Sequence, residues 1–246
     1  MLPVSDRRKS PLIPLAIAAV AVIALIATLV GAAGNDDPDN AADRGASSSS
    51  RADDSGRAPD DTWEQLVRRE PGDPMALGEV DAPVVMLAYS EFQCPFCGKF
   101  ARDTAPTLIE EYVEDGTLRI EWRDFPYLGP QSTTAAQAGR AAAAQDSFWA
   151  FHDELYDHQL PPNSGGLDED YLAGIAAEIG LDVEQFRTDL TSAAAEQAVA
   201  RDFAQGQAIG VTGTPAFVIN GVPVMGAQPT EVFEQAIEQA AAEADR

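Results

Sequence analysis

The chain has 246 residues and a formal net charge of −24, from 40 acidic and 16 basic side chains. Most of that charge lies in residues 63–246, which hold 31 acids and 10 bases, a net charge of −21. So acidic a surface repels nucleic acid and anionic lipid, and we expect no nucleic-acid partner. Much of the acidity is explained by solubility alone. The same 184 residues are enough for one sizeable hydrophobic core.

The beginning of the chain has the pattern of a membrane segment. Residues 1–11 contain Arg7, Arg8 and Lys9, and residues 12–33 contain no charged residue. About 20 apolar residues can cross a bilayer as a helix, and positive charge remains on the cytoplasmic side. We therefore predict a cytoplasmic N-terminus over 1–11, a single-pass transmembrane anchor over 12–33 and an extracytoplasmic domain. A cleaved signal peptide is the alternative, although its apolar core is normally shorter.

Residues 34–62 form an acidic, serine-rich stretch whose only apolar side chains, apart from prolines, are alanines. This composition cannot offset the entropy lost when a chain becomes ordered. We predict a disordered linker there, followed by one folded domain over 63–246.

The only two cysteines, Cys94 and Cys97, lie close together at a predicted strand-to-helix junction. The apolar, β-branched run Val84–Tyr89 predicts a buried strand, and apolar residues at helical spacing over Thr104–Val113 predict a helix. At the start of a helix, free backbone N–H groups and the helix dipole favour the thiolate of the first cysteine. Because the thiolate is the nucleophile of disulfide exchange, the motif indicates redox chemistry.

Two other uses of this cysteine pair are weaker. A structural disulfide closing a four-residue loop removes little entropy from the unfolded chain, about 2 kcal/mol. A zinc site normally needs four Cys or His ligands, and a second CxxC is absent. His152 and His158 lie far along the chain among aromatic residues, where packing or surface roles are expected, so we predict no metal site.

The rest of the domain alternates between strand and helix patterns. Leu118, Ile120 and Trp122 share one face of an alternating run, and Trp149 and Phe151 are further candidates for the core. The expected elements are, in order, a strand over Leu118–Phe125, three to five helices over 131–210, a strand over Pro215–Ile219, an Asn220-Gly221 hairpin turn, a strand over Val222–Met225 and a closing helix over Thr230–Ala244. Within the helical block, Asp168, Asp182 and Ser192 are predicted N-caps.

Three stretches of this pattern belong together: Ala88–Cys97 (AYSEFQCPFC), Arg123–Pro126 (RDFP) and Gly210–Gly221 (GVTGTPAFVING). In combination they resemble the DsbA-like branch of the thioredoxin superfamily. The resemblance covers nearly all of residues 63–246. It implies an α/β thioredoxin-like fold with an inserted helical domain at about 131–210.

The resemblance also implies an activity, an extracytoplasmic thiol:disulfide oxidoreductase that introduces disulfides into exported, cysteine-containing proteins. No cofactor is implied beyond the redox-active disulfide of Cys94 and Cys97. Cys94 would be the exposed nucleophile and Cys97 the buried resolving thiol. A quinone-linked membrane partner would reoxidise the pair.

Further site residues follow from the same resemblance. It places the loop of Thr214 and Pro215 against the dithiol, with a cis peptide bond and with the Thr214 backbone offered to an extended substrate peptide. The alternative from the residues alone is an ordinary trans proline at the start of a strand. Pro95 and Phe96 lie between the cysteines. Some relatives have histidine in place of Phe96, and a phenylalanine cannot add a cation beside the thiolate.

Glu91, three residues before Cys94, has two interpretations. If it lies close to Cys94, its charge opposes the thiolate or it relays a proton; otherwise it is a solvated acid at the end of a strand. Some relatives carry an acid earlier in this strand, where this chain has Ala88. We expect an oxidant weaker than histidine-containing relatives but stronger than a cytosolic thioredoxin.

Two other functions remain open at the level of the sequence. One is a disulfide reductase or isomerase, although an isomerase usually needs a dimerisation domain that residues 34–62 cannot supply. The other is a thioredoxin-like chaperone or peptide-binding module with an idle dithiol. Alkylation of Cys94 at neutral pH would separate the last case from the enzymes.

Overall fold

The computed structural model describes residues 63–244 and 246 of the chain. The predicted cytoplasmic N-terminus, anchor and linker over residues 1–62 lie outside these described residues. Of the helices within the described part, none is long and apolar enough to span a bilayer.

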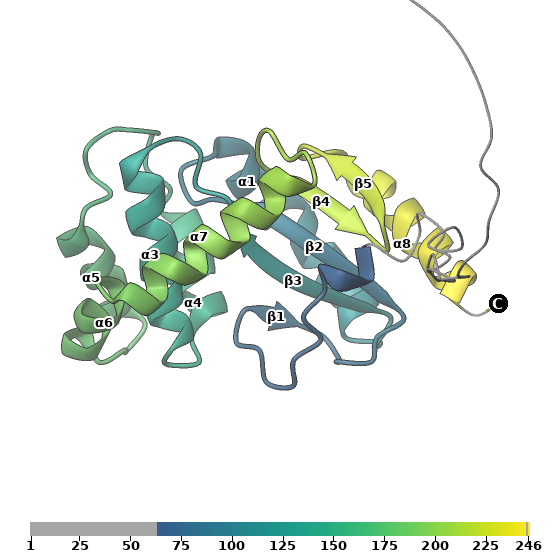
Figure 1. The fold of residues 1–246 in the computed structure, drawn as a ribbon, viewed down its shortest axis with the longest axis horizontal. Helices are drawn as coiled ribbons and strands as arrows, with labels where there is room; N and C mark the ends of the chain where they lie inside the picture. Colours follow the sequence, from purple (N-terminus) through teal and green to yellow (C-terminus); the bar gives the residue numbers. More distant parts are fainter. Residues whose placement is uncertain (1–62, 245) are drawn as a thin grey trace, which may run out of the picture. The chain divides into compact units, whose positions relative to one another are not determined.

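Within residues 63–244, five strands form one mixed sheet (Figure 1). They are β1 (Ala76–Leu77), β2 (Val84–Ser90), β3 (Leu118–Asp124), β4 (Ala216–Ile219) and β5 (Val222–Met225). The spatial order is β1-β3-β2-β4-β5, with β2 parallel to β3 and antiparallel to β4. β2 is buried along its whole length, as its uninterrupted apolar run predicts. The predicted strands are confirmed, and the two-residue strand β1 is an addition.

The helix that follows β2 runs from Pro95 to Val113 in four consecutive segments. These are α1 (Pro95–Lys99), the π-helical η2 (Phe100–Thr104), α2 (Ala105–Leu108) and the π-helical η3 (Ile109–Val113). Pro106 lies in the middle and has no N–H to donate to the preceding turn, which favours a local departure from the α-helical hydrogen-bond pattern. Gly116 ends the segment with a positive φ of 84°.

Five helices make up the predicted helical block between β3 and β4. They are α3 (Pro130–Ala143), α4 (Phe148–Asp157), α5 (Glu169–Glu178), α6 (Val183–Leu190) and α7 (Ala193–Ala208). Three of them begin at the predicted caps: the side chains of Asp168, Asp182 and Ser192 accept a hydrogen bond from the backbone N–H three residues later. The block therefore follows the sequence prediction in both position and helix count.

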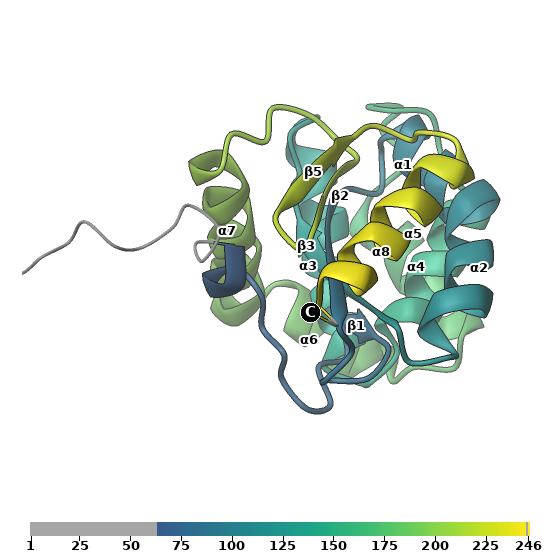
Figure 2. The same ribbon diagram turned by 90° about the vertical axis from the view of Figure 1, so that its right-hand side faces the viewer.

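Helices cover both faces of the sheet. Figure 2 shows α2 and the closing helix α8 (Thr230–Ala244) on one side of the strands and α7 on the other. On the first side, Phe100 packs between Phe217 and Phe233, with ring centroids 4.4 and 5.2 Å away. On the second side, Phe125 packs against Phe203 of α7 at 4.6 Å. A third apolar cluster, around Phe92, joins the helical block to the dithiol segment.

The charged face of β3 is buried rather than solvated. Glu121 accepts hydrogen bonds from Arg119 Nε at 3.0 Å and from Arg123 Nη2 at 2.8 Å, and also from the backbone N–H groups of Arg68 and Arg69 at 2.9 Å each. The segment before β1 therefore closes over this face. Burial alone would raise the pKa of Glu121, but the backbone N–H groups of Arg68 and Arg69 and the guanidinium of Arg123 hold it at about 2.

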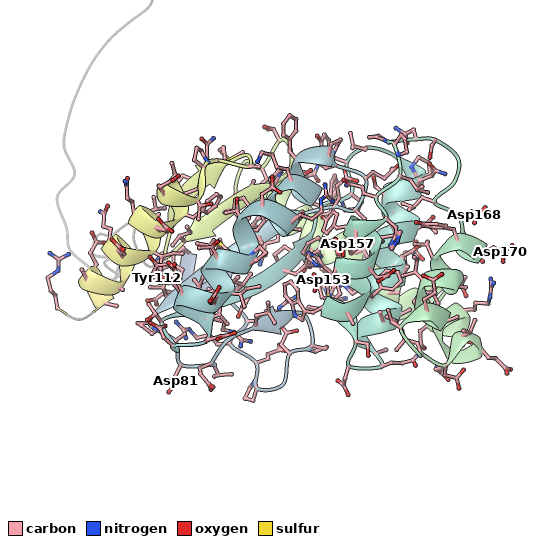
Figure 3. All side chains as sticks on the ribbon, turned by 180° about the vertical axis from the view of Figure 1, so that it is seen from behind. Asp81, Tyr112, Asp153, Asp157, Asp168 and Asp170 are labelled. Carbon is pink, nitrogen blue, oxygen red and sulfur yellow. The ribbon has the colours of Figure 1, made fainter. Side chains whose placement is uncertain are left out.

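The excess of acidic residues lies largely on the outer surface. Figure 3 labels Asp153 and Asp157 on α4, and Asp168 and Asp170 at the start of α5, on the outside of the helical block. The side chains of Asp153 and Asp170 are 72% and 88% exposed. Charge of this kind favours solubility, in agreement with the simpler interpretation of the composition.

Candidate functional site

The dithiol lies where β2 passes into α1, as the sequence predicts. Cys94 is the N-cap of α1, and its carbonyl accepts the backbone N–H groups of Cys97 and Gly98, both at 3.1 Å. Pro95 occupies the first helical position, where a missing N–H costs nothing. Both thiols are free. The first cysteine therefore stands at the N-terminal edge of the helix, with its side chain beside the backbone N–H groups of Phe96 and Cys97.

The prediction that Cys94 is exposed is wrong for this structure. Cys94 is 2% exposed and Cys97 is 1% exposed, whereas Phe96 between them is 64% exposed. The reason is a contact from the far end of the domain: Cys94 Sγ donates a hydrogen bond to the backbone carbonyl of Thr214 at 3.2 Å. The loop before β4 thus covers the thiol, and Phe96 marks the accessible tip of the motif.

The peptide bond between Thr214 and Pro215 is cis, as expected. Pro215 stands directly before β4, and its carbonyl accepts the N–H of Gly226 at 2.8 Å, which ties the loop to the end of the β4–β5 hairpin. The Asn220-Gly221 turn of that hairpin has positive φ at both residues, 42° and 88°, the geometry that this pair favours. The structure thus brings Thr214 into contact with Cys94 across 120 residues of sequence.

The two thiols have opposite acid–base properties. The hydrogen bond from the Cys97 thiol is the largest of several effects that lower the pKa of Cys94 to about 6; contacts with Thr214 and the backbone N–H groups of Cys97 and Phe96 add to it, while burial opposes it. Burial raises the pKa of Cys97 well above the ordinary thiol value. At neutral pH, Cys94 is therefore mostly a thiolate and Cys97 a thiol, and the hydrogen bond from Cys94 to the Thr214 carbonyl belongs to the protonated form of Cys94.

Glu91 is buried beside this pair, so the interpretation as a solvated strand-end acid is wrong. It is 2% exposed, and its Oε2 accepts a hydrogen bond from the hydroxyl of Ser132 on α3. Its Oε1 is buried without a hydrogen-bond partner among the described residues. Burial and, to a smaller extent, the charge of Cys94 raise the pKa of Glu91 to about 7 against the opposing effect of the Ser132 hydrogen bond. Ala88, where some relatives carry an acid, is buried in β2.

Several polar residues at the dithiol were not singled out from the sequence. The Tyr156 hydroxyl donates to the Glu91 carbonyl at 3.0 Å and lies 3.1 Å from Ser90 Oγ. Gln93 Nε2 donates to Ser132 Oγ at 2.8 Å. Gln159 Nε2 bonds the carbonyls on both sides of Gln93. These contacts all join the dithiol segment to the helical block, and only a three-dimensional arrangement reveals them.

The histidines have the packing and surface roles that the sequence predicts. His152 is buried in an aromatic cluster, with ring centroids 5.2 Å from Trp122 and 4.7 Å from Tyr156. His158 is exposed at the end of α4. Across residues 63–244, no three His, Cys, Asp or Glu side chains gather in a way that could hold a metal ion.

A mixed sheet with an N-capping CxxC dithiol, a cis-proline loop in contact with it and a helical insertion defines the thioredoxin-fold oxidoreductases as a class. The family model described as thioredoxin matches residues 70–239. A probable disulfide bond formation protein D of Bacillus cereus is 37% identical over 150 residues, which cover 59% of this chain and 69% of that protein.

Solved structures agree with this likeness. The crystal structure of oxidised BdbD from Bacillus subtilis covers 70% of this chain and 94% of its own, with a TM-score of 0.65 and 23% identity, and so supports the fold. A thioredoxin-like oxidoreductase from Silicibacter pomeroyi is 30% identical, with a TM-score of 0.60 and the same two coverages. The chain belongs to the thioredoxin family and is a thiol:disulfide oxidoreductase.

Proposed function

We propose that this protein donates the disulfide of Cys94 and Cys97 to cysteine-containing proteins outside the cytoplasm. One observation carries the proposal: Cys94 is the N-cap of α1, where the Cys97 thiol, the Thr214 side chain and the backbone N–H groups of Cys97 and Phe96 lower its pKa to about 6. A thiolate stabilised in this way makes the reduced form the favoured one, so the disulfide form is driven to oxidise other thiols.

The reaction proceeds in two exchanges. A substrate thiolate attacks Cys94 Sγ of the disulfide, a new S–S bond forms, and the Cys94–Cys97 bond breaks. Cys97 takes the electron pair and then a proton, because its pKa lies well above neutral. A second substrate thiolate then attacks the substrate sulfur of the mixed disulfide, and Cys94 leaves as a thiolate. The substrate loses two electrons and the dithiol gains them.

Glu91 acts as a proton store beside this exchange. Its pKa of about 7 is close to neutral, so the carboxyl group can hold or release a proton under working conditions. The charge of the Cys94 thiolate favours its protonated form, and the hydroxyl of Ser132 holds one carboxyl oxygen in place. When Cys94 becomes a neutral disulfide sulfur, the carboxyl group loses its proton more readily.

The substrate peptide binds in an extended form along Thr214 and Pro215. The carbonyl of Thr214 lies 3.2 Å from Cys94 Sγ, so a backbone that pairs with this loop brings its own cysteine to the dithiol. Two exposed aromatic residues, Phe96 and Tyr127, supply apolar contact area close by. Phe96 stands between the two cysteines. Tyr127 lies close enough to Cys94 to be affected by its charge: burial, and after it this charge, raises the pKa of Tyr127.

The location and partners follow from the family and the N-terminal sequence. We infer a membrane anchor over 12–33 and a linker over 34–62 that hold the catalytic domain, 63–246 with its helical insertion at about 131–210, outside the cytoplasm. Disulfides persist there and are lost in the cytosol. A membrane partner that passes electrons to quinone would restore the disulfide. The dithiol itself serves as the redox group, without a further cofactor.

A single assay tests this proposal. The oxidised full-length protein is mixed with a reduced, unfolded protein that has two cysteines, and thiol loss in that protein is followed with time. We expect two substrate thiols to be lost for each protein disulfide reduced. Transfer that runs only from the reduced enzyme to substrate disulfides would assign a reductase. Cys94 that resists alkylation at neutral pH would leave only a binding module with an idle dithiol.

A further inference from the structure

Gln159, a residue of the helical block, hydrogen-bonds the backbone of the dithiol segment. It lies just after α4, half-buried, and its own backbone N–H bonds the Tyr156 carbonyl at 3.3 Å. Its side-chain nitrogen Nε2 donates to the carbonyl of Phe92 at 3.0 Å and to the carbonyl of Cys94 at 2.9 Å. One side chain from the helical block therefore hydrogen-bonds the backbone on both sides of Gln93, the residue before the nucleophile Cys94.

These two bonds use the full donor capacity of the amide. An amide nitrogen carries two hydrogens, and each goes to a different carbonyl. The Cys94 carbonyl then accepts three bonds, from Gln159 and from the backbone N–H groups of Cys97 and Gly98, both at 3.1 Å. Because the two backbone bonds form the first turn of α1, the third bond fixes the direction in which that turn begins.

The first turn has room for this amide only because residue 98 is glycine. A Cβ atom added at Gly98 would lie 2.3 Å from Gln159 Oε1 and 2.8 Å from Arg102 Nη1. Gly98 is buried within α1, where alanine would otherwise be the better helix former. The amide of Gln159 therefore occupies the space that a side chain at position 98 would need.

We propose that Gln159, with Gly98 as its seat, is a positioning residue that aligns the start of α1 so that its backbone N–H groups face the sulfur of Cys94. The inference rests on the proposed function, because it concerns how the thiolate of that reaction is stabilised. The N–H groups of Phe96 and Cys97 both lower the pKa of Cys94, and their alignment depends on the turn that the Cys94 carbonyl closes. Loss of the two Gln159 hydrogen bonds lets this turn relax, so the two N–H groups stabilise the Cys94 thiolate less.

The test measures the pH dependence of Cys94 alkylation and the equilibrium with glutathione, both on the full-length protein. In Gln159→Ala, and in Gln159→Met, which keeps the length but loses both donors, we expect a higher pKa for Cys94. A rise of one unit from about 6 lowers the thiolate fraction at pH 6 about fivefold. The glutathione equilibrium should move toward a less oxidising protein by up to about tenfold.

Gly98→Ala provides an independent route to the same defect. It displaces the amide by contact, so it should raise the pKa of Cys94 as Gln159→Ala does. In the double variant the pKa of Cys94 should rise no more than in either single variant, because both changes remove the same pair of Gln159 hydrogen bonds. Two additive shifts would contradict a shared contact.

Gln145→Ala is the matched control. Gln145 is also half-buried and makes two bonds, from its Nε2 to the Asp182 carbonyl at 3.1 Å and from the Asp182 N–H to its Oε1 at 2.9 Å, far from the dithiol. It should lower stability without moving the pKa of Cys94. If Gln159→Ala and Gln159→Met behave like this control, the positioning role is wrong and Gln159 is only a structural cross-link. If wild-type Cys94 itself titrates like an ordinary thiol, the proposed function fails instead.

Discussion

The Sγ atom of Cys94 donates a hydrogen bond to the carbonyl oxygen of Thr214, 120 residues later in the chain. The bond joins the N-terminal edge of the dithiol helix to the loop before β4, and it buries a nucleophile that the sequence predicts to be exposed. Only the protonated Cys94 thiol can make this bond, because the disulfide form that a substrate thiolate attacks has no hydrogen on Cys94 to donate. In the disulfide form the Thr214 carbonyl is therefore free to accept a hydrogen bond from the substrate backbone, so the redox state and substrate binding are coupled at one atom.

The order of attack predicts which single-cysteine variant retains substrate. Cys97→Ser keeps the low-pKa sulfur of Cys94 and removes the thiol that would release it, so mixed disulfides with substrate should accumulate. Cys94→Ser should trap little, because Cys97 is buried and its pKa is high. Non-reducing electrophoresis after rapid acid quenching measures both. Adducts that form mainly in Cys94→Ser would reverse the assignment.

Phe96 offers a way to strengthen the oxidant. Its side chain is largely exposed, so Phe96→His should leave stability nearly unchanged while it brings a cation close to the Cys94 sulfur. We expect the pKa of Cys94 to fall below about 6 and the glutathione equilibrium to shift about three- to tenfold toward a stronger oxidant. Phe96→Ala, which adds no charge, is the control. Equal shifts in both variants would show that the aromatic ring, and not the cation, matters.

Glu91 predicts a specific pH dependence of stability. Its folded pKa is about 7, above the usual carboxyl value, so the reduced folded protein binds an extra proton between about pH 4.5 and 7. The stability from this group is fully present below pH 4.5 and is lost as the pH rises through 7. In Glu91→Gln this loss, at most about 3 kcal/mol, should disappear.

The measurement for Glu91 is urea unfolding of the reduced protein from pH 4.5 to 8. Cys94 also titrates, in the opposite direction: its lowered pKa stabilises the folded form at high pH, and this stability is lost as the pH falls through about 6. Because the charges of Cys94 and Glu91 interact, the comparison is repeated in a Cys94→Ser background, where the difference between the curves with and without Glu91→Gln isolates Glu91. Glu110→Gln, an exposed acid on η3, is the control and should reproduce the wild-type curve. Parallel curves for wild type and Glu91→Gln would contradict the raised pKa.

The buried charges of β3 predict a large loss of stability on substitution. Glu121→Ala leaves Arg119 and Arg123 buried without their shared partner and orphans two backbone N–H groups, so unfolding should become easier by about 3–5 kcal/mol. Denaturant unfolding measures this loss. Asp103→Asn, which breaks the exposed pair with Lys99, is the control and should have no measurable effect. A Glu121 variant as stable as this control would show that the cluster contributes nothing.

Much of the fold can be predicted from local patterns. The strand at Val84, the Asn220-Gly221 hairpin and the closing helix Thr230–Ala244 each have a signal within a few residues, and the structure has them where they are expected. The caps at Asp168 and Ser192 are also local, since each needs only a side chain and a nearby N–H. Signals that extend over only a few residues can be recognised without knowledge of the tertiary structure.

The features that were missed depend on contacts between distant segments. Period-two alternation in β3 gives no sign that the Glu121 face is covered, because the cover comes from Arg68 and Arg69, more than 50 residues earlier. Glu91 has a buried partner only because α3 brings Ser132 to it. Gln159 follows an amphipathic helix like any polar residue, and its importance emerges only when the Phe92 and Cys94 carbonyls lie beside it.

The central claim is that the reduced form of this protein is the more stable one, and one measurement tests it directly. The free energy of unfolding in denaturant is determined for the dithiol and the disulfide forms of the full-length protein at pH 7, with Cys94→Ser/Cys97→Ser as the reference without a redox pair. Because the redox potential and the two stabilities belong to one thermodynamic cycle, an oxidant must unfold more easily when its cysteines are joined. We expect the dithiol form to be the more resistant. A disulfide form that is more resistant than the dithiol form would contradict the account and would assign a reductase.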